Sequence, residues 1–181
     1  MPEKIYNVLF ICSANSARSI MAEAILNRIG QGRFRAFSAG SEPAGAVHPL
    51  AMDLLKRLDF DTRQLRSKYW SEFSGEAALP LDFVFTVCDK AAGEPCPIWP
   101  GQPIRAHWGV EDPALLYATE ARQKKLFFDV YCLLKRRIEL FCELPIAKLD
   151  SLMLIRQLDQ IVHATAEMTS TADAQDCSLK P

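Results

Sequence analysis

Short apolar stretches and amphipathic helical stretches alternate along most of this chain, and no other feature of the sequence limits the fold as much. The stretches typical of buried strands are residues 5–11, 33–38, 81–87 and 104–108. Those with apolar residues at helical spacing are 17–29, 49–58, 120–143 and 149–162. Strands that alternate with helices form a parallel sheet with helices on both faces. The sequence therefore predicts an α/β fold.

The length allows a single domain. A chain of 181 residues can bury its own core but has little left for a second domain. We expect the domain to span residues 1–164, including the last helix at about 149–162. The stretch 165–181 is small and polar, and we expect it to be a disordered tail.

Charge and hydropathy exclude two classes of partner. With 21 basic and 22 acidic residues the net charge is −1, which argues against an electrostatic nucleic-acid binder. No apolar run approaches the roughly 18–20 residues that span a bilayer. The first residues lack the layout of a signal peptide. We therefore expect a cytoplasmic protein with no nucleic-acid or membrane partner.

The cysteines are scattered, at positions 12, 88, 96, 132, 142 and 177. In a reducing cytosol such thiols are more often catalytic, redox-active or buried than bridged. We expect Cys132 and Cys142, on one long helix, to be structural thiols, and Cys177 in the polar tail to have no role. No Cys or His spacing resembles a zinc site, so no metal is expected.

Ligands of parallel sheets bind at the carboxyl ends of the strands, and the first such end carries Cys12. Arg18 follows where the next helix opens, and the residues between them are small enough for a tight loop with inward N–H groups. Arg18 can clamp an oxyanion with two hydrogen bonds. In that field we expect the pKa of Cys12 to fall, with Ser19 donating to the thiolate. The predicted oxyanion-binding residues are Ser13, Ala14, Asn15, Ser16, Ala17, Arg18 and Ser19.

Two more strand ends carry suggestive groups. Asp112 lies in the loop after the last strand and could protonate a leaving oxygen, with Glu111 as the competing candidate. Cys88 directly follows the third strand, and Cys96 lies in the Pro- and Gly-rich stretch 93–103. These two thiols are either a disulfide relay or two unrelated buried cysteines.

Taken together, these motifs resemble a known superfamily. Cys12-x5-Arg18-Ser19 with Asn15 inside, Ser38-Ala39-Gly40 and Asp112-Pro113 resemble the low-molecular-weight protein tyrosine phosphatases. Residues 86–97, His107-Trp108-Gly109 and residues 112–114 look more like the arsenate reductase branch of that superfamily. The similarity runs from about residue 5 to 162.

The resemblance implies a flavodoxin-like three-layer fold with a four-stranded parallel sheet. It implies Cys12 as nucleophile, Arg18 as oxyanion clamp, Asp112 as general acid and Asn15 as the residue that shapes the loop. Cys88 and Cys96 match the two shuttle thiols of the thioredoxin-linked reductases.

This chain also departs from the pattern. Ala14 and Ala17 stand where many members carry Gly and a second Cys. Glu23 and Ser38 match ligands of the potassium site of some reductases, but residues 67–68 are Ser-Lys near the position of the expected acidic partner. The resemblance therefore leaves open whether this chain requires potassium.

Two functions follow as expectations. The first is reduction of arsenate to arsenite by Cys12 with a relay through Cys88 and Cys96. No cofactor would be bound, thioredoxin or glutathione with glutaredoxin would donate electrons, and arsenate, phosphate or sulfate would bind as oxyanions. The alternative is a phosphotyrosine phosphatase that hydrolyses a phosphocysteine on Cys12. A catalytically silent redox sensor on the same fold is a third reading, against which the complete set of Cys12, Arg18 and Asp112 argues.

Overall fold

The computed structural model describes residues 4–114, 118–166 and 177. Its sheet consists of β1 (Tyr6–Cys12), β2 (Phe34–Gly40), β3 (Phe83–Thr86) and β4 (Ile104–His107). The α-helices are α1 (Arg18–Ile29), α2 (Pro49–Arg57), α3 (Asp89–Gly93), α4 (Glu120–Glu143) and α5 (Ser151–Ala166). Two 3₁₀ turns, η1 (Trp70–Phe73) and η2 (Ile146–Lys148), complete the described elements.

The expected α/β fold with a four-stranded parallel sheet is confirmed. Each predicted strand and helix is present, with ends that differ by a few residues. Only α3 and the two 3₁₀ turns were not predicted. Helix α5 continues to Ala166 and so includes residues 165 and 166, which the sequence assigned to the tail. Apart from residue 177, the rest of the predicted tail lies outside the described residues.

The strand order β2-β1-β3-β4 creates a switch point between β1 and β3. From β1 the chain moves to one side to form β2, and it later returns to the other side to form β3. The register aligns the carboxyl ends of the strands: Cys12 pairs with Gly40, Ile11 with Thr86, and Thr86 with His107. A ligand crevice is expected at this switch point, and Cys12 lies there.

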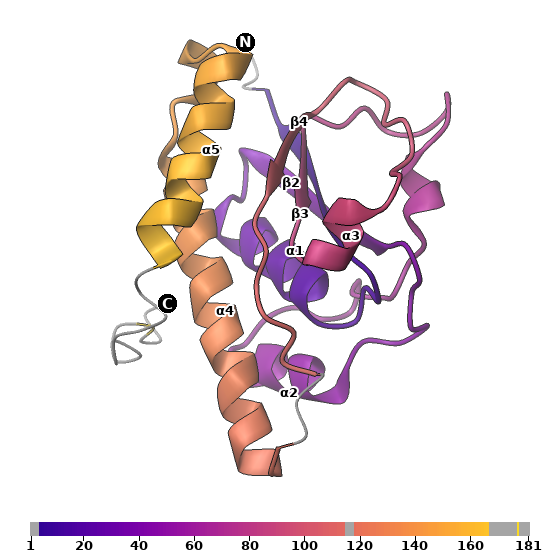
Figure 1. Cartoon of the computed structure of the whole chain (residues 1–181), viewed down its shortest axis with the longest axis vertical. Helices are drawn as coiled ribbons and strands as arrows, with labels where there is room; N and C mark the ends of the chain where they lie inside the picture. The colour runs from indigo at the N-terminus through magenta and orange to yellow at the C-terminus, as the bar shows by residue number, and fades with distance from the viewer. Residues whose placement is uncertain (1–3, 115–117, 167–176, 178–181) are drawn as a thin grey trace.

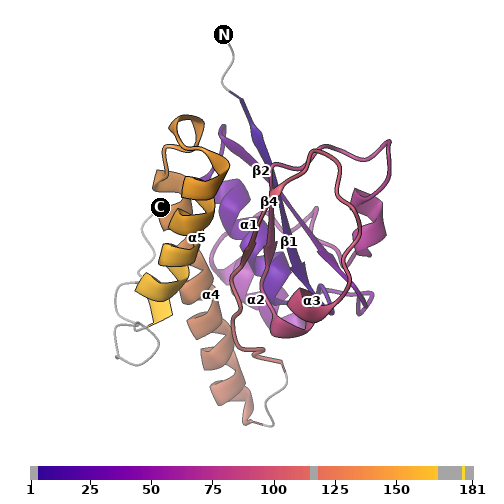
Figure 2. The same cartoon turned by 45° about the horizontal axis from the view of Figure 1, so that its top comes forward.

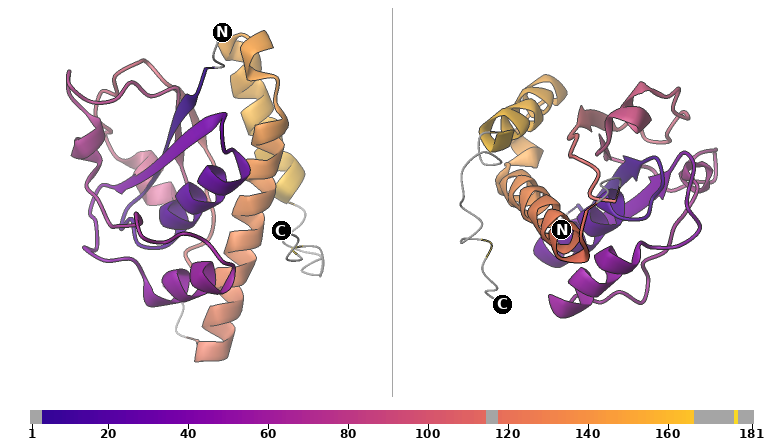
Figure 3. Two further views of the ribbon diagram at one scale, coloured as in Figure 1. Left: turned by 180° about the vertical axis from the view of Figure 1, so that it is seen from behind. Right: turned by 60° about the horizontal axis from the view of Figure 1, so that its bottom comes forward.

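Helices cover the two faces of the sheet unequally (Figures 1 and 2). Helices α1 and α4 lie on one face, and α5 packs along α4 and beside β4 (Figure 3). Phe85 of β3 packs against the indole of Trp108, with ring centroids 4.2 Å apart, and both rings contact Phe141 of α4. Among the described residues, the other face carries the short α3, the 3₁₀ turn η1, which contributes Trp70, and the loop that contributes Trp99. The second face therefore has the thinner cover.

One expectation about the cysteines is wrong. Cys132 of α4 forms a disulfide with Cys177, with Cα atoms 5.9 Å apart, which is an ordinary separation for a bridge. The expectation compared Cys132 only with Cys142, which lies on the same helix, and treated the tail as unconnected. Cys12, Cys88, Cys96 and Cys142 carry free thiols.

Within the described residues, no helix is both long enough and apolar enough to cross a membrane.

Candidate active site

The loop of residues 13–17, between β1 and α1, presents its N–H groups inward. Its carbonyls are held from outside by the segment 42–48: Ser13 accepts from Glu42 N (3.0 Å), Ala14 from Ala44 N (2.8 Å) and Ser16 from His48 N (2.8 Å). In a trans peptide the N–H points away from the carbonyl, so the N–H groups of residues 14, 15 and 17 point to the opposite side. None of these three donates a hydrogen bond to another group in the described part of the chain. They form a nest suited to an anion.

Two residues give the loop its shape. Asn15 has a φ of +42°, a left-handed conformation that asparagine tolerates better than most residues. Gly40, at the end of β2, lies so close to the loop that a Cβ there would sit 2.3 Å from the Ser13 oxygen. The loop therefore requires a residue that tolerates a positive φ at position 15 and a residue without a Cβ at position 40.

Cys12 is buried, and its sulfur lies 2.9 Å from the Ser19 hydroxyl. Asn15 Nδ2 donates to the same hydroxyl at 2.8 Å. Burial raises the pKa of the Cys12 thiol, while the Ser19 hydrogen bond and the charge of Arg18 act to lower it. The sequence predicted a lowered pKa for Cys12, and this prediction is wrong for the protein without substrate. Desolvation of the sulfur raises the pKa more than Ser19 and Arg18 lower it, and the charge of Arg18 is shared with another group.

That other group is Asp112. Arg18 donates from Nη2 to Asp112 Oδ2 at 2.8 Å and from Nη1 to the Val110 carbonyl at 3.2 Å. The Ala114 N–H fixes the second carboxylate oxygen of Asp112 at 3.0 Å. Glu111, the competing candidate, is exposed. The structure thus brings Asp112 to the mouth of the nest.

Helices α4 and α5 hold the loop that carries Asp112. Arg137 of α4 is buried and donates from Nη1 to the carbonyls of Trp108 (2.9 Å) and Gly109 (3.1 Å). Its Nε donates to Thr165 Oγ1 of α5 at 3.0 Å. Burial lowers the pKa of Arg137 to about 10, so the group stays charged near neutral pH.

Cys88 lies against the nest, as expected. Its sulfur accepts hydrogen bonds from the Ser13 N–H at 3.3 Å and the Ala91 N–H at 3.4 Å, and the Ser13 hydroxyl is 3.5 Å away. The side chain is buried and caps α3. A second free thiol therefore touches the loop that holds Cys12.

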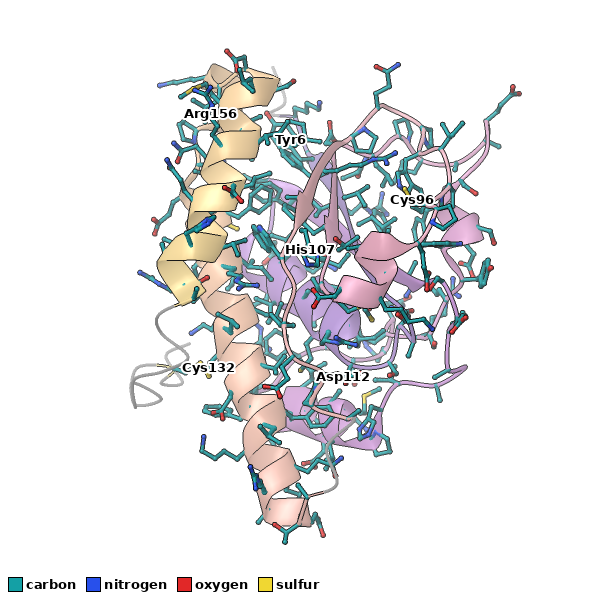
Figure 4. The ribbon with its side chains drawn as sticks, in the orientation of Figure 1. Tyr6, Cys96, His107, Asp112, Cys132 and Arg156 are labelled. Carbon is teal, nitrogen blue, oxygen red and sulfur yellow. A yellow bond between two sulfur atoms is a disulfide. The ribbon has the colours of Figure 1, made fainter. Side chains whose placement is uncertain are left out.

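Cys96 is not brought to the other two thiols. It is exposed, and Arg105 Nη1 donates to its sulfur at 3.1 Å. Arg105 belongs to β4 and pairs with Val84 of β3. Figure 4 shows Cys96 on the other side of α3 from Asp112. Cys96 lines a pocket of about 250 Å³ together with Trp99, Arg105 and His107.

Several features that hold the two loops of the site were not predicted from the sequence. The segment 42–48 acts through backbone N–H groups, which leave no signature in residue types. A buried cluster of Lys68, Glu23 and Ser38 lies beneath the loop; the resemblance placed these three residues near one another, but the burial of Lys68 and its contact with Glu23 were not predicted. Arg137 gave a further signal, because it falls between the apolar residues that α4 turns inward. No group of three or more His, Cys, Asp and Glu side chains that could hold a metal occurs within the described ranges.

Known proteins are similar to this chain in sequence and in fold. Residues 7–151 match the family described as low molecular weight phosphotyrosine protein phosphatase. An arsenate reductase of Oceanobacillus iheyensis is 34% identical over 144 residues, which cover 79% of this chain and 98% of the relative. A solved arsenate reductase in a phosphate-binding state has a TM-score of 0.62 at 28% identity, and the match covers 76% of this chain and 96% of that one. A thioredoxin-dependent arsenate reductase of Corynebacterium glutamicum has a TM-score of 0.50 at 25% identity, over 78% of this chain and 65% of that one.

Proposed function

Because this chain belongs to the low molecular weight phosphotyrosine protein phosphatase family, we propose that it uses the fold to reduce arsenate to arsenite through a relay of three cysteines. One observation carries the proposal: the buried sulfur of Cys88 accepts a hydrogen bond from the loop that holds Cys12. A phosphatase needs one thiol at this place, whereas reduction of arsenic needs a second thiol to supply the other electron.

The first step is attack on the bound oxyanion. The nest and Arg18 hold arsenate, and the Cys12 thiolate attacks the arsenic. The proton of the buried Cys12 thiol passes to the dianionic substrate on binding, because burial keeps that thiol protonated in the free protein. Asp112 takes up that proton from the bound substrate and returns it to the leaving oxygen, which departs as water. The product is an arsenic–sulfur adduct on Cys12.

The second step reduces the arsenic. The Cys88 thiolate attacks the Cys12 sulfur, the sulfur–arsenic bond breaks, and its electron pair stays on the arsenic, which leaves as arsenite. Cys12 and Cys88 are then joined by a disulfide. Cys96 attacks Cys88, releases the Cys12 thiolate and forms a Cys88–Cys96 disulfide. Since Cys96 lies beside Arg105, the loop of residues 93–103 has to rearrange for this exchange.

An external dithiol completes the cycle. We propose thioredoxin as the donor, because a dithiol supplies the two electrons that reduce a Cys88–Cys96 disulfide. The exposed Cys96 makes this disulfide accessible to the donor. Glutathione with glutaredoxin is the alternative, acting directly on the Cys12 adduct. Either donor would place the protein in the cytoplasm. Phosphate and sulfate have the same tetrahedral shape as arsenate and should compete for the nest.

The test follows oxidation of NADPH by thioredoxin reductase and thioredoxin in the presence of arsenate. Cys12→Ser should abolish turnover. Cys96→Ser should release one arsenite per protein and stop with a Cys12–Cys88 disulfide, which peptide mapping identifies. Cys142→Ser is the matched control, since Cys142 lies outside the site, and should turn over like the wild type. Repeated turnover of Cys96→Ser with thioredoxin would show that the relay is wrong, and glutathione with glutaredoxin would then be tested as donor.

A further inference from the structure

A buried lysine lies beneath the nucleophile loop, and nothing in the proposed reaction uses it. The Lys68 side chain is 6% exposed, and its ammonium lies 2.7 Å from the Arg66 carbonyl, 3.4 Å from Ser38 Oγ and 3.6 Å from Glu23 Oε2. The Ser38 hydroxyl also donates to the Glu23 carboxylate. A cation thus stands at the centre of three oxygens from different parts of the chain.

These contacts decide whether an alkali-metal ion fits. Glu23 and Ser38 match ligands of a potassium site in some reductases, but here their oxygens already face the Lys68 ammonium. A second cation among the same oxygens would be repelled at close range in a buried, poorly screened place. The residues of this chain therefore do not fit a potassium ion while Lys68 is present.

The backbone of Lys68 continues from this cluster to the nucleophile. Its N–H donates to Asn15 Oδ1 at 2.7 Å, and its carbonyl accepts from Gly40 N at 2.9 Å. Because a backbone N–H can only donate, it fixes the amide of Asn15 with Nδ2 toward Ser19. The Ser19 hydroxyl accepts that bond, so its own hydrogen is free to point at the Cys12 sulfur 2.9 Å away. The direction of each donor in this chain favours a thiolate on Cys12.

We propose that Lys68 is a positioning residue for Cys12: its ammonium is a built-in cation that replaces a bound alkali-metal ion and holds the Asn15–Ser19 chain in register. The inference rests on the assignment of Cys12 as nucleophile in the proposed function. Without the ammonium, the buried Glu23 carboxylate would be left without its cation. The strand-like segment that carries the Lys68 backbone would then shift, and Asn15 and Ser19 would follow.

Other charges act on the same groups and are part of the design of the test. Arg18 and Cys88 face Cys12, while Glu23, Arg66 and Glu72 act on Lys68. Burial lowers the pKa of Lys68 and raises that of Glu23, and the attraction between them opposes both shifts. Only the Lys68 side chain is changed in the first comparison, so these groups stay constant.

The experiment measures the thiol of Cys12 without arsenate. Alkylation by iodoacetamide is followed against pH, with the Cys12 peptide quantified by mass spectrometry. Lys68→Met keeps the length of the side chain and removes its charge. This variant should slow alkylation of Cys12 at pH 8 about tenfold, which is the effect of losing one charge-assisted hydrogen bond. The pH at the midpoint of the Cys12 alkylation profile should rise by about one unit. Lys125→Met, which removes an exposed lysine paired with Asp129 on α4, is the control and should match the wild type.

The replacement of a bound ion is tested by substitution of salts. Melting temperature and the alkylation profile of Cys12 are measured in potassium, ammonium and choline chloride at one ionic strength. The wild type should respond equally to all three. Lys68→Ala, which leaves room among the oxygens, should regain stability and the wild-type profile in potassium or ammonium but not in choline. A wild type that is stabilised by potassium over choline would overturn the proposal.

Two further outcomes keep the test decisive. If Lys68→Met does not fold, the double variant Glu23→Gln/Lys68→Met removes both buried charges. Its Cys12 midpoint should still be raised, because no ammonium then holds the Arg66 carbonyl and the Ser38 hydroxyl beside the Lys68 backbone. A wild-type midpoint in either variant refutes the positioning role. Since alkylation and melting need no arsenate, a protein that shows these shifts but reduces no arsenate would retain the proposal and lose the proposed function.

Discussion

Gly40→Ala should distort the loop of residues 13–17 through steric overlap alone. The Cβ of Gly40→Ala would lie 2.3 Å from the Ser13 oxygen and 3.0 Å from the Asn15 nitrogen, whereas ordinary contact begins at 3.4 Å. The Ser13 carbonyl cannot retreat freely, because it accepts from Glu42 N at 3.0 Å. Overpacking of this kind costs about 1–3 kcal/mol, and a lost hydrogen bond adds about 1 kcal/mol.

The net effect is smaller than that total, because alanine also restricts the unfolded chain, which stabilises by about 0.4–1 kcal/mol. We expect Gly40→Ala to lower the free energy of unfolding by about 2–3 kcal/mol and the melting temperature by roughly 5–10 °C. The displaced loop should also weaken phosphate binding about tenfold or more, seen as a smaller rise in melting temperature with phosphate.

The matched control is Gly93→Ala. Apart from its chain neighbours and its own helix, no atom of the described residues lies within 4 Å of the Cβ that this change would add. The free energy of unfolding should therefore equal or slightly exceed that of the wild type. Urea unfolding followed by circular dichroism measures both variants. A Gly40→Ala protein within about 0.5 kcal/mol of the wild type, with unchanged phosphate affinity, would refute the steric argument.

Three further predictions concern the charged groups and the remaining thiols. Arg18→Lys should abolish the phosphate-dependent rise in melting temperature and slow arsenate reduction about 100-fold or more, because a point charge cannot replace the two-pronged clamp; unchanged phosphate binding would remove Arg18 from the site. Asp112→Asn should slow arsenate reduction and also lower the midpoint of Cys12 alkylation, because Arg18 keeps its full charge. Since the thiolate forms as pH rises through the pKa, Cys12 should then be alkylated faster at pH 8, and an unchanged midpoint would contradict the role of the ion pair. Burial raises the pKa of Cys142 to about 11, so only about 0.1% is thiolate at pH 8, and peptide mapping should find the exposed Cys96 alkylated far earlier; equal rates would contradict this.

Much of the fold followed from side-chain pattern. The apolar run at residues 5–11 and the helical spacing at 120–143 predicted β1 and α4 nearly residue by residue, because both elements bury a continuous set of apolar side chains. The strand order was not predictable in this way, since strands buried on both faces carry no periodic pattern that distinguishes their neighbours.

In the site, too, some properties could be predicted from residue type and others could not. Cys12, Arg18 and Asp112 were predicted from residue type at strand ends. In the structure Arg18 donates to Asp112 and its charge acts on the Cys12 sulfur, while the catalytic roles of the three residues stay predictions. The raised pKa of Cys12 was not foreseen, since the sequence does not show how completely the sulfur is removed from water. The resemblance placed Lys68 near Glu23 and Ser38, but its burial was not predicted, because a buried lysine depends on a carboxylate that is distant in sequence, here Glu23. These properties depend on three-dimensional surroundings rather than on spacing.

The guanidinium of Arg137 gives the last helix an influence on the reaction that its position in the chain does not suggest. It joins the carbonyls before Asp112 to Thr165 of α5, and the shared family region ends at residue 151, so most of α5 is an addition to the common core. Substitutions in α5 should therefore shift the loop that carries Asp112, the proposed acid, while the residues of the nest stay the same. Natural selection can therefore act on the sequence of α5 through its effect on the rate of the reaction, although this helix lies outside the site.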